Sequence, residues 1–195
     1  MIKIISIIDY GSGNIGSVKR AFEANGELVK IVKTKKEILK AKKIVLPGVG
    51  SFGFIMKKLR EKNLEKPLKE KIKEGTPYLG ICLGLQILFE ESEESPGIKG
   101  LCIFKGKVKK FKKGKIPQIG WNEIIPKNKI LEKDFFYFVN SYYIKPKDEK
   151  NVASTTNYFQ NFVSAIKYKN ITAVQFHPEK SGKTGLKLLK RWSKC

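Results

Sequence analysis

The chain has 195 residues, few enough for one domain and enough to bury roughly 70% of its unfolded surface. Its three cysteines lack C-x-x-C spacing, which argues against a disulfide framework and a zinc site and favours a reducing, cytoplasmic location. The early apolar run is too short for a signal peptide or a membrane span, so no membrane partner is expected.

The formal net charge of +22 raises nucleic acid as a partner. Base readout and phosphate clamping favour arginine, however, and only three of the 40 basic residues are arginines: Arg20, Arg60 and Arg191. The lysines are spread along the whole chain, and isoleucine is abundant where alanine is scarce, a bias typical of AT-rich coding. We therefore predict no nucleic-acid partner. The charge can still steer anionic substrates or an acidic protein surface toward the chain.

The first half of the chain alternates between strand and helix signals. Its strand candidates are near-continuous apolar runs, which are typical of strands buried on both faces of a parallel sheet. Its helix candidates are lysine-rich and amphipathic, and Asn14 stands where a helix cap is expected. The expected strands span 2–8, 28–32 and 44–46, and the expected helices span 14–23, 51–60 and 64–73.

Two glycine-rich turns follow expected strands. The turn Asp9–Asn14 and its neighbour Gly16 give G-x-G-x-x-G spacing, but residues 30–36 are basic where a dinucleotide site needs an acidic residue. We expect no dinucleotide there. The second turn, Pro47-Gly-Val-Gly50, can direct a backbone N–H toward developing negative charge, although an ordinary strand–helix turn accounts for it equally well.

Residues 78–90 contain the strongest signal in the chain. A short apolar run predicts a buried strand ending at Cys82, and Leu83, Ile87 and Leu88 then recur at helical spacing. Gly80 and Gly84 flank the cysteine, as required where two backbones crowd a strained strand-to-helix turn. The partial positive charge of a helix N-terminus stabilises a thiolate. The pattern therefore predicts a nucleophilic cysteine, with a buried structural cysteine as the alternative.

A cysteine nucleophile needs a base, and His177 is the single histidine. It follows an apolar strand expected at 171–176 and precedes Glu179 by two residues. The order nucleophile, base and carboxylate is that of a catalytic triad, with the base at the carboxyl end of a strand.

The second half of the chain changes to short β-type runs separated by glycine and proline. We expect them to continue the first sheet, so that residues 1–195 form a single domain. The predicted fold is an α/β three-layer sandwich with a mostly parallel central sheet and helices on both faces. The expected later strands span 101–104, 118–125, 135–139 and 152–157, and a closing amphipathic helix spans 181–192.

Gly80-Ile-Cys-Leu-Gly-Leu-Gln86 with the distant Phe176-His-Pro-Glu179 resembles the class I, triad-type glutamine amidotransferases, whose fold is flavodoxin-like. Other segments narrow the resemblance, over essentially the whole chain, to the glutaminase subunits of imidazole glycerol phosphate synthase. These segments are 9–14, 47–52, 117–122 and 177–181.

The resemblance implies roles for particular residues. Cys82, His177 and Glu179 form the triad, and glutamine contacts Gln86 and the backbone of Ser141 and Tyr142. The family usually has histidine where this chain has Asn140, which puts a side-chain role there in doubt. Further implied positions are the oxyanion hole at Gly48, Val49, Gly50 and Leu83, and a partner interface at Asn14 and Lys180.

The implied reaction is hydrolysis of glutamine, without metal or organic cofactor. The ammonia passes to a (β/α)₈-barrel cyclase subunit, which makes imidazole glycerol phosphate and an aminoimidazole carboxamide ribotide in histidine biosynthesis. Three alternatives remain open. The chain can be a glutaminase for another pathway such as amino-sugar synthesis, a pyridoxal-phosphate-synthase glutaminase, which fits 47–50 and 118–121 poorly, or a non-enzymatic basic binding module.

Overall fold

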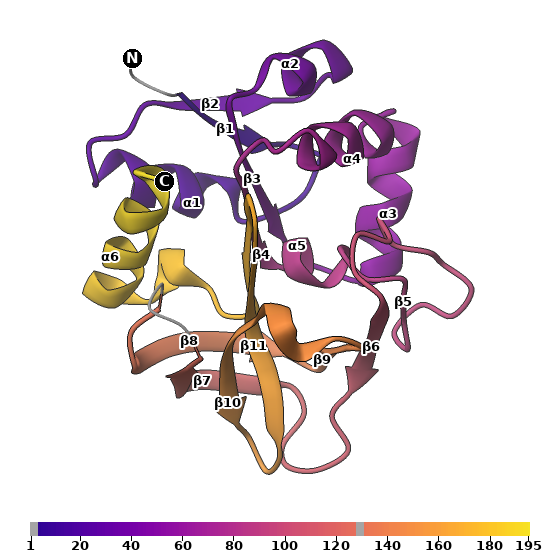
Figure 1. The fold of residues 1–195 in the computed structure, drawn as a ribbon, viewed down its shortest axis with the longest axis vertical. Coiled ribbons are helices and arrows are strands. Elements are labelled where there is room, and N and C mark those ends of the chain that lie inside the picture. Colours follow the sequence, from indigo (N-terminus) through magenta and orange to yellow (C-terminus); the bar gives the residue numbers. More distant parts are fainter. Residues whose placement is uncertain (1–3, 128–130) are drawn as a thin grey trace.

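A computed structural model describes residues 4–127 and 131–195. One mixed sheet of twelve strands runs through the molecule in the order β2-β1-β3-β4-β12-β11-β10-β7-β8, with β9, β6 and β5 branching from β11 (Figure 1). Its strands are β1 (Ile5–Ile8), β2 (Val29–Val32), β3 (Lys43–Gly48), β4 (Tyr78–Cys82), β5 (Glu91–Ser92), β6 (Gly106–Lys110), β7 (Gln118–Pro126), β8 (Asp134–Asn140), β9 (Tyr142–Pro146), β10 (Val152–Asn157), β11 (Asn161–Tyr168) and β12 (Ile171–Val174).

The five strands from β2 to β12 run parallel. Every residue of β1, β3, β4 and β12 is buried, as the near-continuous apolar runs predict for strands covered on both faces. The expected parallel strands are therefore confirmed, although Ile2 and Lys3 of the first one lie outside the described residues.

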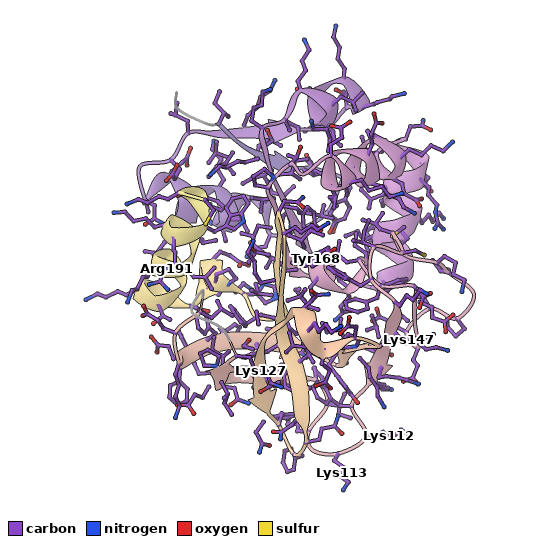
Figure 2. The ribbon with its side chains drawn as sticks, viewed as in Figure 1. Lys112, Lys113, Lys127, Lys147, Tyr168 and Arg191 are labelled. Carbon is purple, nitrogen blue, oxygen red and sulfur yellow. The ribbon has the colours of Figure 1, made fainter. Side chains whose placement is uncertain are left out.

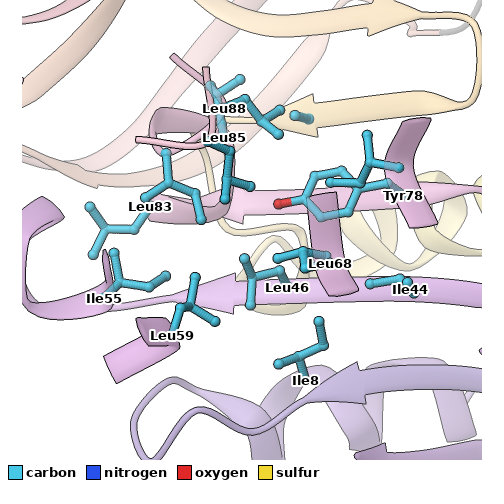
Figure 3. Packing of buried hydrophobic residues seen from close by; sticks show 14 of the residues in the cluster. Ile8, Ile44, Leu46, Ile55, Leu59, Leu68, Tyr78, Leu83, Leu85 and Leu88 are labelled. Carbon is cyan, nitrogen blue, oxygen red and sulfur yellow. The ribbon is translucent and has the colours of Figure 1, made fainter. Parts of the chain in front are cut away.

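Helices cover both faces of the parallel strands (Figure 1). Successive side chains of β3 alternate between two cores: Ile44 and Leu46 pack with α2 to α5, and Val45 packs with α1 and α6. Figure 3 shows the first core, in which Leu46 and Tyr78 lie among leucine and isoleucine side chains. The helices are α1 (Ile15–Glu23), α2 (Lys35–Lys40), α3 (Phe52–Glu61), α4 (Glu65–Lys73), α5 (Leu83–Gln86) and α6 (Gly182–Ser193), and short 3₁₀ turns lie at Glu149–Asn151 and Pro178–Lys180.

Beyond β12 the sheet becomes antiparallel, from β11 through β10 and β7 to β8. The expected strands at 118–125, 135–139 and 152–157 are confirmed, but the one at 101–104 is wrong. The Leu101 and Ile103 amides instead donate to the carbonyls of Ile87 and Leu88, at 2.7 and 2.8 Å. No pattern in the sequence predicted the strands β5, β6, β9 and β11.

The parallel strands β3, β4 and β12 all end at the same edge of the sheet. In open α/β sheets, sites form at the carboxyl ends of strands and where the strand order changes. β12 ends at this edge beside β4, and at its other side the sheet changes from parallel to antiparallel.

Candidate active site

Cys82 lies at the junction of β4 and α5 and has a left-handed backbone conformation, with φ of +55°. A non-glycine residue adopts this conformation at a cost, and such strain is concentrated at functional sites. The two flanking glycines are required by close packing. A Cβ on Gly80 would lie 2.4 Å from the Gly84 carbonyl oxygen, and one on Gly84 would lie 2.1 Å from that of Leu46. The elbow predicted from the sequence is thus present.

The helix after Cys82 is shorter than the periodicity predicts. It is a single turn, Leu83–Gln86, because the carbonyls of Ile87, Leu88 and Phe89 accept amides from residues 101–104 instead of continuing the helix. One turn carries little of the dipole of a long helix. Stabilisation of an anionic sulfur must therefore come mainly from neighbouring side chains.

His177 and Glu179 are buried beside this elbow. The His177 Nδ1 lies 2.8 Å from Glu179 Oε1, and the two side chains are 5% and 1% exposed. The 3₁₀ turn that starts at Pro178 folds the Glu179 carboxylate back beneath the imidazole. This arrangement holds one ring nitrogen and leaves the other available to a reacting group.

The environment of His177 favours its protonated form. Burial lowers the pKa of the imidazole, but hydrogen bonds with the Cys82 and Glu179 side chains outweigh burial and raise it to about 10. An imidazolium held between a sulfur and a carboxylate is the charge state that pairs with a thiolate. The three residues predicted as a triad therefore form one connected group.

Asn14 contacts this group directly. The sequence suggested that its side chain caps α1, but the structure contradicts this: Asn14 occupies the N-cap position without a side-chain cap bond. Its Nδ2 instead donates to Glu179 Oε1 at 3.1 Å. That oxygen thus accepts two hydrogen bonds, whereas Glu179 Oε2 is buried without a partner among the described residues.

The 47–50 turn lies next to the nucleophile, since Gly48 pairs with Cys82 across β3 and β4. A Cβ on Gly48 would lie 2.5 Å from the Leu83 Cβ, so glycine is required here as well. Gly50 has a φ of +97°. The Val49 amide donates to the Tyr10 hydroxyl oxygen at 3.3 Å, so in this structure it is engaged by a side chain.

A cavity of about 300 Å³ opens at Cys82. All four residues predicted for an oxyanion hole and all three predicted for glutamine binding line it, with Cys82, His177 and the exposed Lys180. The remaining lining residues are Glu94, Pro117, Val139 and Asn140.

Two side-chain amides converge on one backbone carbonyl at the far side of the cavity. Gln86 Nε2 and Asn140 Nδ2 donate to the Tyr142 carbonyl oxygen at 3.3 and 3.0 Å. The Ser141 carbonyl accepts the Phe111 amide at 3.0 Å. Asn140, whose side-chain role the sequence left in doubt, therefore orders the backbone of the binding segment.

Sequence reasoning missed three polar residues at the site. Glu94 lines the cavity, its carboxylate accepts the Phe52 amide at 2.6 Å, and burial raises its pKa. Tyr10 holds the Val49 amide, and Gln175 contacts Cys82. Glu94 falls in the acidic stretch after the elbow and Gln175 lies two residues before His177, but nothing in either pattern marks a site.

Within residues 4–127 and 131–195, no three His, Cys, Asp or Glu side chains are grouped so as to hold a metal ion. The helices of the same described part are all too short or too polar to cross a membrane.

Comparison with known proteins identifies the family. The model of the class-I glutamine amidotransferases matches residues 6–193. The chain belongs to this family. Among its relatives are imidazole glycerol phosphate synthase subunits HisH. That of Pyrococcus furiosus is 49% identical, covering 96% of this chain and 97% of the relative, and that of Aquifex aeolicus is 47% identical, covering 96% and 95%. At 49% identity over nearly the whole length of both chains, this chain also belongs to the HisH group of the family.

Solved structures of low identity agree with the fold. A glutamine amidotransferase crystal structure superposes with a TM-score of 0.80 at 19% identity, covering 98% of this chain and 99% of the other. The PurLQS structure from Thermotoga maritima gives a TM-score of 0.77 at 19% identity, covering 98% and 97%. The α/β amidotransferase fold predicted from the sequence is confirmed.

Proposed function

We propose that the chain, as a single amidotransferase domain, is the cytoplasmic glutaminase subunit of an imidazole glycerol phosphate synthase. The observation that carries this proposal is the connected group of Cys82, His177 and Glu179 at one end of a 300 Å³ cavity, in a chain 49% identical to a HisH subunit.

Hydrolysis begins when the Cys82 thiolate attacks the γ-amide carbon of glutamine. The negative charge moves to the amide oxygen, where N–H groups of the 48–50 turn and of Leu83 stabilise it. His177 gives its proton to the departing nitrogen, so that the C–N bond breaks, ammonia leaves and a thioester remains. Glu179 stabilises the imidazolium and keeps the ring oriented.

The second half of the reaction releases glutamate. Neutral His177 takes a proton from water, and the resulting hydroxide attacks the thioester carbon. The C–S bond then breaks and the thiolate returns, paired again with the His177 imidazolium. No electron acceptor or metal ion is needed for the balance of these steps.

The charges around the cavity suit an amino-acid head. A carboxylate accepts only, so its contacts with Ser141 and Tyr142 run through N–H groups, and the carbonyls of both residues are already hydrogen-bonded. The α-ammonium needs acceptors, and two face this region: the Glu94 carboxylate and Gln86 Oε1, which is buried without a partner among the described residues.

The cyclase partner docks, in this proposal, over an apolar row on the outer face of the β7–β8 hairpin. Ile119, Trp121 and Phe135 are 61%, 56% and 52% exposed. Trp121 packs against Tyr137 on the paired strand, with ring centroids 6.1 Å apart. Ile119 pairs with Val139, and Val139 lines the cavity, so the apolar row adjoins the cavity. Exposed apolar surface of this kind marks interaction sites. Lys180, which lines the same cavity, and Asn14, which donates to Glu179, are the other residues proposed for this interface.

The decisive experiment measures glutamate release from glutamine by this chain with and without a purified cyclase subunit and its nucleotide ligand. We expect rapid turnover only in the complex, with imidazole glycerol phosphate as a product. Rapid ammonia supply to an amino-sugar synthase instead would support the paralogous pathway. Trp121→Glu should weaken co-elution with the cyclase, whereas Phe159→Glu, at an aromatic residue in the β10–β11 turn that is 67% exposed, should not.

A basic binding module is the weaker candidate. The lysine side chains project from many elements (Figure 2), and Lys112, Lys127 and Lys147 lie in separate parts of the chain. Many lysines are paired with carboxylates on the surface, among them Lys58, Lys71 and Lys109. Binding to DNA or RNA should be weak, independent of sequence and lost as salt rises.

A further inference from the structure

Gln175 is a fully buried polar side chain to which the proposed mechanism gives no role. Its Nε2 lies 3.4 Å from the Cys82 sulfur, and its Oε1 accepts Gln86 Nε2 at 3.0 Å. We propose that Gln175 is a positioning residue, which orients the nucleophilic sulfur and connects it to the substrate-binding Gln86.

The donor and acceptor of each hydrogen bond follow from the Tyr142 carbonyl, at which the series of bonds ends. The Tyr142 carbonyl can only accept, so Gln86 must present its NH₂ group to it and to Gln175. Gln175 must then present its oxygen to Gln86 and its NH₂ group to Cys82. Rotating either amide by 180° would set two donors or two acceptors against each other. The sulfur therefore faces a donor, which favours its anionic form.

Backbone hydrogen bonds also fix the position of Gln175. Its amide donates to the Ser164 carbonyl at 2.8 Å, and the His177 amide donates to the Tyr137 carbonyl at 2.9 Å. The base and the positioning amide therefore belong to one short segment, anchored at both ends to neighbouring strands. The Cys82 sulfur gains a hydrogen-bond donor from this segment.

A donor to the sulfur acts twice in a cycle. Before attack it stabilises the thiolate and restrains the side chain of a residue with strained backbone. When the thioester breaks, the sulfur again becomes anionic, and the same N–H stabilises the leaving group. Loss of the donor should therefore lower kcat more than it changes KM.

Two substitutions separate the donor from the rest of the side chain. Gln175→Glu keeps an oxygen for Gln86 Nε2 but removes the donor to the sulfur, and Gln175→Met removes both bonds at similar volume. Gln118→Leu is the matched control, because Gln118 is another buried glutamine, 3% exposed, that does not line the cavity. The first readout is the rate at which iodoacetamide alkylates Cys82, followed by peptide mass spectrometry across pH.

Both Gln175 variants should alkylate Cys82 about 10- to 100-fold more slowly at pH 7, the loss expected for one hydrogen bond to a charged group. Exposed Cys102 in the same sample should react at the parental rate, as should Cys82 in the Gln118→Leu control. With the cyclase present, Gln175→Glu should lower kcat with KM within about threefold of the parent. Gln175→Met should also raise KM, because Gln86 loses its partner.

Parental alkylation of Cys82 in either variant, with parental circular dichroism and melting temperature, would overturn the assignment. The kinetic arm rests on the proposed glutaminase function, but the alkylation arm needs no glutamine. Failure of the proposed function would thus appear as an inactive parent complex, independently of the alkylation result.

Discussion

The two walls of the cavity differ in how completely they are built. On the triad wall, the side chains of Cys82, His177 and Glu179 are buried, His177 is hydrogen-bonded to Glu179, and its interactions with Cys82 and Glu179 raise the pKa of the imidazole. On the oxyanion wall, which is the neighbouring 47–50 turn, Val49 is 36% exposed, and its amide donates to the Tyr10 hydroxyl. The proposed triad is thus assembled in the isolated chain, whereas the Val49 amide, a proposed oxyanion donor, is engaged elsewhere. This contrast suggests that a partner activates the enzyme by completing the second wall.

The largest effect should follow from breaking the triad wall. Cys82→Ala should lower glutaminase activity of the complex by at least about 1,000-fold, because it removes the nucleophile. The fold should persist, and cyclisation with ammonium salts should continue in the cyclase subunit. Loss of the ammonia-dependent reaction in a well-folded complex would contradict the division of labour between the subunits.

The second prediction concerns the oxyanion wall. Adding the cyclase and its nucleotide ligand should raise glutamate release by on the order of 100- to 1,000-fold, the usual effect of one oxyanion donor. Alkylation of Cys82 should change far less, because the triad wall is already formed. If the lone chain turns over as fast as the complex, the contrast between the walls has no functional meaning.

The third prediction concerns the charge on the triad wall. His177 has a pKa raised from 6.5 to about 10, so the charged imidazole stabilises the folded state fully below pH 6.5, and this stabilisation is lost as the pH rises through about 10. Since the chain has one histidine, its imidazole NMR signal can be followed without assignment. It should titrate near pH 10 in the parent and at lower pH in Cys82→Ala.

Urea unfolding provides the matching stability measurement. The difference in stability between the parent and His177→Asn should decrease as the pH rises from about 7 to about 10.5, because both proteins share the titration of the groups that do not contact His177. An imidazole signal that titrates near pH 6.5 in the parent would show that the hydrogen bonds to Cys82 and Glu179 do not outweigh burial.

The smallest expected effect comes from releasing Val49. Burial raises the pKa of Tyr10 to about 12, so its hydroxyl stays protonated at neutral pH. Tyr10→Phe removes the acceptor of the Val49 amide, and one neutral hydrogen bond corresponds to about a 2- to 10-fold change. Basal glutaminase activity should rise by that factor and stimulation by the cyclase should decrease. Tyr143→Phe, at a half-buried tyrosine away from the 47–50 turn, should leave the basal rate unchanged.

Local patterns in the sequence predicted the parts of the molecule that local physics determines. The apolar runs of β1, β3 and β4 require burial on both faces, and the glycines around Cys82 require a crowded turn. Residues 101–104 are equally apolar, but their amides pair with carbonyls that the short α5 leaves free, so periodicity alone predicted a strand there. β6, Gly-Lys-Val-Lys-Lys, carries too few apolar residues to be recognised.

Some features of the candidate site could likewise be predicted from the sequence, and others could not. Cys82, His177 and Glu179 could be selected because their residue types and spacing carry the chemistry. The bonds from Val49 to Tyr10 and from Gln175 to Cys82 join residues 39 and 93 positions apart. Nothing in the local sequence around either residue encodes such a contact, since it depends on the order of strands in the sheet.

The position of β12 has a consequence for when the enzyme becomes active. This strand lies between β4 and β11, and the segment after it carries His177 and also Gln175, which is synthesised 93 residues after Cys82. Until β12 enters the sheet, Cys82 lies on an open strand edge without base or positioning amide. Contacts this distant in sequence form late in folding. A growing chain therefore cannot hydrolyse glutamine before the segment through Glu179 has been made and folded against β4.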